Sequence, residues 1–284
     1  MSDNIRNFRL SDIEENKGYN RVILQIFGLP GNGKSSFINS CKFVIDGGVF
    51  VAHAEAGDNY KGTTTKRIPH ELTKSIWMVD NRGMPTLHRF QTGEIFAQLG
   101  NLLKVNQEVE WVEDFNKNVD RMWAELNNED SLQDLIVPIL IHSVRNNIQK
   151  EAETYRELLN TARELTGITP YIVLTHKYSG GVESMKSVFT NMGIKKIYTI
   201  ENYTTECQSV VREKHEEIIE FLTEVLEDIK FRVIHMGDPR EERQRHYKFI
   251  IKYMKETSDL KKDEDYKNKN SEESGKKKGP CFLF

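Results

Sequence analysis

The sequence VILQIFGLPGNGKS, residues 22–35, determines how the rest of the chain is interpreted. Its first part, residues 22–27, is a short apolar run that ends at a glycine, which predicts a buried β-strand. Its second part, Gly28 to Ser35, matches the pattern G-x-x-x-x-G-K-S/T. Apolar residues then recur at helical spacing as far as Val44. Strand, glycine-rich loop and helix in this order predict a phosphate-binding loop.

The residue types of this loop suit a triphosphate. Glycine tolerates backbone conformations closed to other residues, so successive N–H groups can point inward at a helix N-terminus and hold an anion. Lys34 is expected to neutralise the outer phosphates, and the Ser35 hydroxyl to coordinate Mg²⁺. The alternative is a glycine-rich turn that carries a surface lysine. The residues assigned to nucleotide binding in this loop are Gly28, Gly31, Asn32, Gly33, Lys34, Ser35 and Ser36.

A second motif, D-N-R-G at residues 80–83, follows the apolar strand 75–79. In GTPases the aspartate of such a D-x-x-G motif holds Mg²⁺ and the glycine N–H contacts the γ-phosphate. Between the two motifs lies a segment with several threonines, and one of them would meet Mg²⁺ only while γ-phosphate is present. Thr65 is the first choice and Thr64 the second. The expected metal ligands are Ser35, Thr65 and Asp80, with Gly83 on the phosphate; ordinary polar turns are the alternative.

Strands alternate with amphipathic helices over residues 21–236, which predicts an α/β fold of the P-loop NTPase class in three layers. The sheet is expected to be mainly parallel with helices on both faces. One antiparallel strand is expected because the strands at about 65–72 and 74–79 have a short connection. The other predicted strands are 135–142, 171–174 and 197–200, and the predicted helices include 87–103, 148–165, 182–192 and 211–229.

Changes of composition set the domain boundaries. Residues 1–20 are polar and are interpreted as a flexible leader, and 105–133 as an insertion of uncertain structure within the G domain, residues 21–236. Residues 237–256 are predicted to form a charged helix. Residues 257–284 consist mostly of charged and polar residues, which cannot form a core, so a disordered tether is expected.

The segment expected to recognise the base departs from the usual GTPase motif. GTPases usually carry N/T-K-x-D after a later strand, and this chain has Thr175, His176 and Lys177 there, without the aspartate. That aspartate normally accepts hydrogen bonds from guanine N1 and N2, so its absence leaves guanine and adenine both open. His176 is expected to flank the ring, or else to face solvent. Asn202 belongs to the final base loop, Glu201-Asn202-Tyr203.

Longer pieces of the chain resemble one protein family. They are GLPGNGKSSFINS at 28–40, EIFAQLG at 94–100, and Asn202-Tyr203 ahead of the last core helix. Over about residues 20–230 the chain resembles the interferon-induced protein 44 family. The resemblance implies a G domain with GTP or GDP and Mg²⁺ as its ligands, and a link to innate immune responses.

The position after D-x-x-G predicts slow hydrolysis. Small GTPases have a glutamine there that orients the attacking water, whereas this chain has Met84, which cannot hydrogen-bond water. No catalytic residue is therefore assigned. Homodimerisation or an activating protein is expected to supply the missing group.

The last four residues, Cys281-Phe282-Leu283-Phe284, fit the C-a-a-X prenylation pattern, and a final Phe favours geranylgeranylation. Lys276 to Lys278 lie just upstream and would attract anionic lipid. A prenyl chain with a basic patch supplies the two signals that stable anchoring needs. The alternative is a free cysteine on a flexible tail.

Composition argues against a nucleic-acid-binding protein and against a secreted protein stabilised by disulfides. The chain has 284 residues and a formal net charge of −3, so no basic field indicates nucleic acid as a partner. A polar, acidic start argues against a secretory signal, and three cysteines are too few for a disulfide framework. We therefore expect a cytoplasmic protein that associates with the cytosolic face of a membrane.

Three functions fit these features. The first is a prenylated guanine-nucleotide switch with slow hydrolysis. The second is a pseudo-GTPase that acts as an interaction module, which Met84 and the missing aspartate favour. The third is a P-loop ATPase or kinase, although a kinase would not need both a threonine loop and D-x-x-G.

Overall fold

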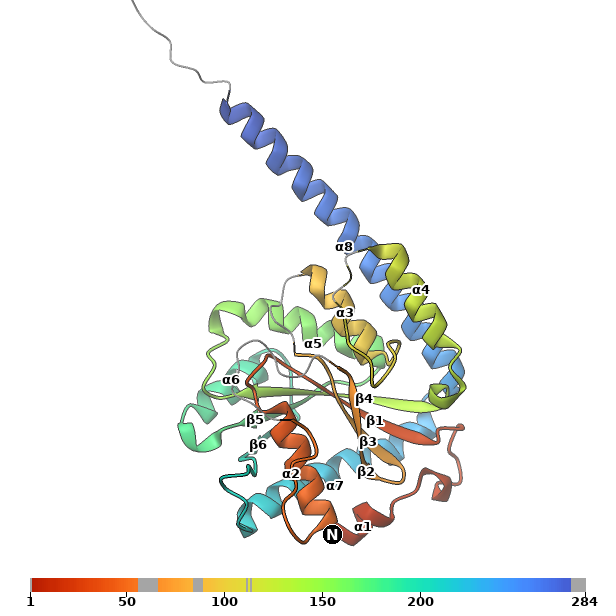
Figure 1. Ribbon diagram of the computed structural model, residues 1–284, viewed down its shortest axis with the longest axis vertical. Helices are drawn as coiled ribbons and strands as arrows, with labels where there is room; N and C mark the ends of the chain where they lie inside the picture. The colour runs from red at the N-terminus through yellow and green to blue at the C-terminus, as the bar shows by residue number, and fades with distance from the viewer. Residues whose placement is uncertain (1, 56–65, 84–88, 111, 113, 277–284) are drawn as a thin grey trace, which may run out of the picture.

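The computed structural model describes residues 2–55, 66–83, 89–110, 112 and 114–276. A six-stranded sheet has the order β2-β3-β1-β4-β5-β6, and β2 runs antiparallel to β3 while the other neighbours are parallel (Figure 1). The strands are β1 (Arg21–Phe27), β2 (Ile68–Thr73), β3 (Ile76–Asp80), β4 (Asp134–Ser143), β5 (Tyr171–Thr175) and β6 (Ile197–Ile200). The predicted α/β fold, mainly parallel with one antiparallel strand, is confirmed.

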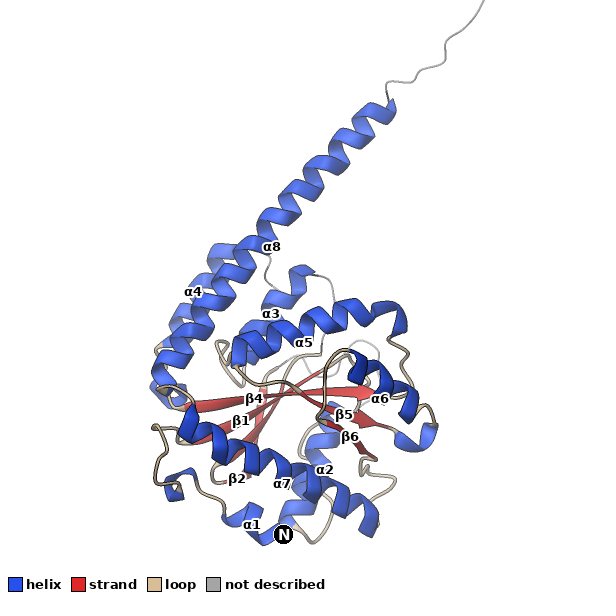
Figure 2. Cartoon of the chain, turned by 180° about the vertical axis from the view of Figure 1, so that it is seen from behind, coloured by secondary structure: helices blue, strands red, loops and turns tan. Residues whose placement is uncertain are grey.

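Helices cover both faces of this sheet, which gives the predicted three layers (Figures 1 and 2). One face carries α1 (Ser2–Asn7), α2 (Lys34–Asp46) and α7 (Arg212–His235). The other carries α3 (Arg89–Leu99), α4 (Phe115–Leu126), α5 (Ala152–Thr166), α6 (Val182–Asn191) and the first half of α8 (Pro239–Lys276). The central strand β4 is buried at every position because both faces are covered.

Residues 2–20 pack on the domain through a few buried side chains, whereas a flexible leader was predicted. Ile5 and Leu10 are each 1% exposed, and α1 lies against α2 and α7. The Tyr19 hydroxyl donates a hydrogen bond of 3.2 Å to the Gly237 carbonyl, which joins this segment to the turn between α7 and α8. A few apolar residues in a polar segment were enough to bury it, and average composition conceals them.

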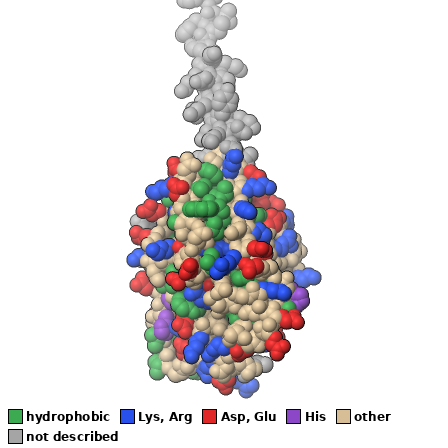
Figure 3. All heavy atoms as spheres, turned by 90° about the vertical axis from the view of Figure 1, so that its right-hand side faces the viewer, with side chains coloured by type: hydrophobic (Ala, Val, Ile, Leu, Met, Phe, Trp, Pro, Cys, Tyr) green, Lys and Arg blue, Asp and Glu red, His purple; other side chains and the backbone are tan. Residues whose placement is uncertain are grey.

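The insertion contains a capped helix. The Asp114 side chain accepts a hydrogen bond of 2.8 Å from the Lys117 N–H, which satisfies one of the open donors at the start of α4. The inner side of α4 is buried at Met122 and Leu126, and the helix packs along α8. Trp123 is 57% exposed and touches the Tyr247 ring of α8 at 5.7 Å between centroids. In Figure 3, hydrophobic side chains gather on the upper part of this face between charged ones.

Helix α8 extends well past its predicted end. It begins at Pro239, where the Asp238 carboxylate accepts from the Arg240 N–H at 2.8 Å. It continues to Lys276, and Figure 1 shows its second half running away from the domain. A disordered tether was predicted over residues 257–284, but residues 257–276 are helical, because Lys and Glu are good helix formers even where hydrophobicity is low. Residues 277–284, with Cys281, lie outside the described residues. Within the described residues, no helix combines the length and apolar character needed to cross a bilayer.

Candidate nucleotide-binding site

The phosphate loop has the backbone that its glycines were expected to permit. Gly28 has φ 145° and Gly33 has φ 83°, both in the region that favours glycine. Close approach excludes a side chain as well. A Cβ on Gly28 would lie 2.3 Å from the Ile141 carbonyl oxygen, and one on Gly33 would lie 3.0 Å from Asn202 Nδ2. Gly33 is the N-cap of α2, so the loop leads directly into a helix N-terminus.

Lys34 lies beside the loop and is almost completely buried. Its Nζ donates to the Leu29 carbonyl at 3.2 Å, which closes the loop around the ammonium group. Burial lowers the pKa of Lys34, and the Asp80 carboxylate opposes this effect. A Cβ on Gly83 would lie 3.3 Å from Lys34 Nζ. The structure therefore brings the glycine of D-x-x-G next to the lysine of the phosphate loop, as both motifs together predicted.

Ser35 and Asp80, two of the three predicted metal ligands, lie in direct contact. The Ser35 hydroxyl donates to Asp80 Oδ2 at 2.7 Å, and Asp80 is 2% exposed. Because the hydroxyl gives its hydrogen to the carboxylate, its oxygen lone pairs remain available to a cation. A hydroxyl and a carboxylate are the hard oxygen ligands that Mg²⁺ prefers. These residues fit Mg²⁺, and the third predicted ligand, Thr65, lies outside the described residues together with Thr64 and Met84.

Three of the predicted ligands hold the loop through their side chains or backbone. Asn32 is fully buried: its Nδ2 donates to the Ile141 carbonyl at 3.2 Å and its Oδ1 accepts from Asn146 Nδ2 at 2.6 Å. Thr175 Oγ1 donates to the Asn32 carbonyl at 2.8 Å, and Asn202 Nδ2 to the Gly33 carbonyl at 3.2 Å. These side chains fix the loop onto β4, β5 and the end of β6. Their principal role in the structure is thus positioning of the loop.

The two other loop residues lie where predicted. A Cβ on Gly31 would meet nothing within 4 Å, so this side of the loop is open. Ser36 is in the first turn of α2, and its carbonyl accepts from Ser40 Oγ at 2.7 Å. Neither arrangement conflicts with a phosphate above the loop.

His176 is held in a defined orientation after β5. Its backbone is left-handed, with φ 57°, and its Nδ1 lies 2.9 Å from Ser143 Oγ and 3.1 Å from Thr175 Oγ1. A non-glycine residue in this conformation stores strain and is often found at functional sites. The two hydroxyls therefore fix the orientation of the ring through Nδ1.

Lys177 turns toward α7. Its Nζ lies 2.8 Å from Glu213 Oε1 and 2.5 Å from Glu217 Oε1. Burial disfavours its charged form, but these two carboxylates outweigh burial and raise the pKa of Lys177. This ion pair ties the base loop to α7, and the contact of Lys177 with a nucleotide stays a prediction.

A carboxylate that the motif lacked comes from the next strand. Glu201 follows β6, and its Oε2 accepts a hydrogen bond of 3.4 Å from the Tyr178 N–H. Counted from Thr175 as the first motif residue, position 178 is where N/T-K-x-D would place its aspartate. Inspection of the motif alone could not find this group because it is separated in sequence and reaches the site through pairing of β5 with β6. The signal that pointed to it was its place in the final base loop.

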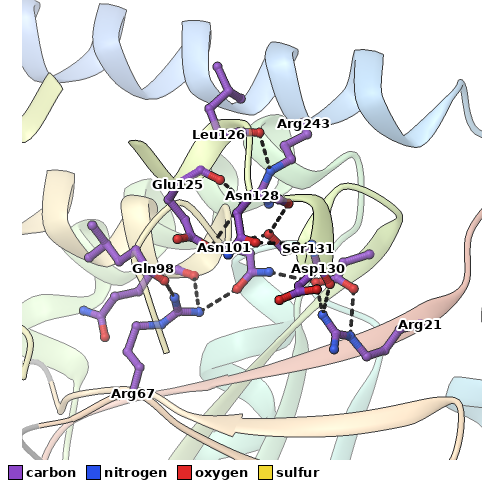
Figure 4. Close-up of polar contacts among 12 residues, drawn as sticks. Arg21, Arg67, Gln98, Asn101, Glu125, Leu126, Asn128, Asp130, Ser131 and Arg243 are labelled. Atoms are coloured by element: carbon purple, nitrogen blue, oxygen red, sulfur yellow. Dashed lines mark hydrogen bonds and ion pairs between the residues drawn. The ribbon is translucent and has the colours of Figure 1, made fainter. Parts of the chain in front are cut away.

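Behind the site lies a buried polar network centred on Arg67, a fully buried residue (Figure 4). The Arg67 guanidinium donates to five acceptors: Asn81 Oδ1 at 2.9 Å, Asn101 Oδ1 at 2.9 Å, Gln98 O at 3.2 Å, Gln25 Oε1 at 3.3 Å and the Leu103 carbonyl. Asn101 passes the network on to Asp134 at 3.0 Å, and Arg21 pairs with Asp134 at 2.8 Å. The network holds the D-N-R-G turn against the end of α3.

Comparison with known proteins identifies no relative: no family model matches the chain, and no curated protein matches it.

Proposed function

We propose that the chain is a guanine-nucleotide-binding switch protein with slow GTP hydrolysis, tethered to a membrane by a prenylated C-terminus. The observation that supports nucleotide binding most strongly is the convergence of Lys34, Ser35, Asp80 and Gly83 from two separate motifs. If the loop were only a glycine-rich turn with a surface lysine, Lys34 would be exposed. Lys34 is instead buried, and it lies next to Gly83 of the second motif. Mg²⁺, when bound to Ser35 and Asp80, would offset phosphate charge.

Guanine is the base that the site favours in this proposal. Glu201 stands at the backbone of residue 178 and can accept from both N1 and N2 of guanine. Adenine has no hydrogen at N1. Its N1 lone pair would therefore face a lone pair of the Glu201 carboxylate, and the two would repel each other. Burial of an acceptor without its donor is unfavourable, so the same contact selects against ATP.

The D-x-x-G turn supports the switch. Gly83 lies beside Lys34 and could meet a γ-phosphate there. Met84 supplies no group for the attacking water, so hydrolysis is proposed to be slow until a second copy or an activating protein completes the site. A pseudo-GTPase that binds nucleotide without turnover remains the second candidate, favoured by Met84 itself.

Nucleotide binding is tested with GTP, ITP and ATP, each with Mg²⁺, in thermal unfolding. At a hundredfold excess over Kd, GTP should stabilise the chain by about 3 kcal/mol and raise Tm by about 5 to 10 °C. ITP lacks the 2-amino group and should bind about tenfold more weakly, and ATP weaker still. Lys34→Ala should abolish the shift because the outer phosphates lose their counter-charge.

The control for Lys34→Ala is Lys186→Ala, which removes an exposed lysine of α6 and should leave the shift unchanged. Absence of a shift with all three nucleotides would overturn nucleotide binding. A preference for ATP would retain the phosphate site and overturn guanine selection by Glu201.

The membrane tether has its own test. Cells that express the full chain and receive a labelled isoprenoid precursor should incorporate label into the wild type and not into Cys281→Ser, because only Cys281 begins a C-a-a-X sequence. Cys207→Ser changes an exposed cysteine elsewhere and should label normally. An unlabelled wild type would exclude the prenyl anchor, and equal label in Cys281→Ser would place the modification elsewhere.

A further inference from the structure

Helix α8 packs closely against the α3 region. Two glycines, Gly93 and Gly100, allow this close approach. A Cβ on Gly93 would lie 2.9 Å from Met254 Cγ, and a Cβ on Gly100 would lie 2.9 Å from Ile250 Cδ1. Glycine is unfavourable inside a helix, and α3 ends at Leu99, directly before Gly100, although a helix was predicted as far as residue 103. Gly93 and Gly100 lie on the side of the α3 region that faces α8, where they allow the two backbones to approach closely.

A polar contact and an aromatic contact also connect α3 with α8. The hydroxyls of Thr92 and Tyr253 are 2.6 Å apart, and the Tyr253 ring stands edge-on to Phe96 at 4.9 Å between centroids. Ile250 is fully buried in the core that α8 shares with α3, α4 and α5. A sideways shift or rotation of α3 would therefore either displace α8 or open a gap beneath it.

The C-terminal part of α3 contacts the D-N-R-G turn of the candidate nucleotide site. Gln98 of α3 accepts a hydrogen bond of 3.0 Å from the Arg82 N–H through its Oε1. The Gln98 carbonyl accepts from Arg67 at 3.2 Å. Arg82 is the residue before Gly83, which lies beside Lys34. Described contacts thus run without interruption from the phosphate loop through the D-N-R-G turn and α3 to α8.

We propose that the seating of α8 on α3 is a nucleotide-sensitive contact, strengthened when a γ-phosphate holds Gly83 in place. The inference rests on the proposed nucleotide binding. In this structure Gly83 lies next to Lys34 while α8 is seated, so the seated arrangement is the one that a γ-phosphate contact would favour. By linkage, seating of α8 strengthens binding of GTP over GDP to the same extent.

A change in the packing of α8 on α3 would also change the position of the C-terminal end of α8. The helix continues for 22 residues beyond Met254, which corresponds to about 33 Å at 1.5 Å per residue. A change at α3 therefore moves the far end of a long rigid element. The nucleotide state would set the orientation of that element relative to the domain, and with it the approach of the domain to whatever the C-terminus binds.

The test measures hydrogen–deuterium exchange of the full-length chain without nucleotide, with GDP and Mg²⁺, and with GTPγS and Mg²⁺. Residues 239–258 of α8 should exchange more slowly with GTPγS than with GDP. Met254→Glu places a carboxylate against Gly93 and should abolish this difference. It should also weaken GTPγS binding about three- to tenfold relative to GDP. Lys255→Glu introduces the same group at the neighbouring exposed position and should behave as wild type.

A second variant, Tyr253→Phe, removes only the hydroxyl that contacts Thr92 and guards against a folding defect in Met254→Glu. It should change the GTPγS to GDP affinity ratio in the same direction by a smaller factor. If the wild type binds neither nucleotide, the proposed function fails. If it binds both while α8 exchange and the affinity ratios stay equal in all variants, the coupling fails and nucleotide binding stands.

Discussion

Replacing Arg67 with methionine is expected to lower the free energy of unfolding by about 3–5 kcal/mol, because removal of one partner leaves buried polar groups uncompensated. Methionine has a similar length, so the change removes the charge and the donors with little change of volume. Five acceptors would lose the Arg67 donor. Asn101 Oδ1, Gln25 Oε1 and the Gln98 carbonyl would each keep one other donor, whereas Asn81 Oδ1 and the Leu103 carbonyl would lose the donor described for them. A loss of this size is a large fraction of the stability of an ordinary domain.

The charge balance around Arg67 adds to this effect. Burial lowers the pKa of the Arg67 guanidinium to about 9, while Glu125 raises it, Arg243 lowers it and Asp134 raises it. The group is therefore still charged at neutral pH, and it helps to compensate the two carboxylates. Without it, Asp134 keeps Arg21 as its ion-pair partner.

Denaturant unfolding measures the change, with an unchanged slope showing that the loss is one of stability. The matched control is Arg212→Met, since the Arg212 side chain is 89% exposed and pairs only with Glu216 at the surface. That variant should differ from wild type by less than about 0.5 kcal/mol. Equal stability of the two variants would show that the Arg67 network does not contribute as its burial implies.

The sheet and the phosphate loop could be predicted because their signals are local. An apolar run, a glycine pattern and helical spacing all lie within one stretch, residues 22–44. The meeting of Lys34 with Gly83 was predictable too, since parallel strands bring their carboxyl ends to one edge of the sheet. These inferences needed no knowledge of which side chains touch.

The rest depended on partners far away in sequence. Arg67 lies in the predicted strand at about 65–72, where a charged residue would be expected to face solvent. Its partners come instead from β1, the D-N-R-G turn and the end of α3. Gly93 and Gly100 were interpreted through helix propensity, whereas their role is close approach to α8. Propensity describes a residue in isolation, and these contacts exist only in the folded chain.

The base loop shows the same limit. Lys177 was assigned to the nucleotide because it matched a motif, and the motif gave no sign that Glu213 and Glu217 of a distant helix would pair with it. Glu201 likewise reaches the backbone of residue 178 from the end of another strand, and no motif within the base loop of β5 could indicate this contact. A motif fixes residue types at a spacing, and it cannot state which other charges the fold will bring beside them.

The stability of the chain is expected to fall steeply as the pH is lowered below about 6.5, because buried histidines, His142 and His246 among them, must stay neutral in the fold. His142 is fully buried, and burial lowers its pKa to about 4 against the opposing hydrogen bond with the Asn146 carbonyl. His246 of α8 is 5% exposed, and burial followed by the charges of Arg245 and Arg243 lowers its pKa to about 3. In the unfolded chain both would titrate near 6.5.

A histidine whose pKa is lower in the folded state binds its proton more readily when unfolded, so acid favours unfolding between the unfolded and folded pKa values. From pH 7.5 to pH 5.0 each of the two should cost about 2 kcal/mol, since 1.36 kcal/mol corresponds to one pKa unit. Denaturant unfolding at the two pH values should show that His246→Gln and His142→Gln each reduce the pH-dependent loss by that amount. His235→Gln, at an exposed position, should keep the full loss. An unchanged pH dependence in His246→Gln would mean that this histidine is not held neutral beneath α8.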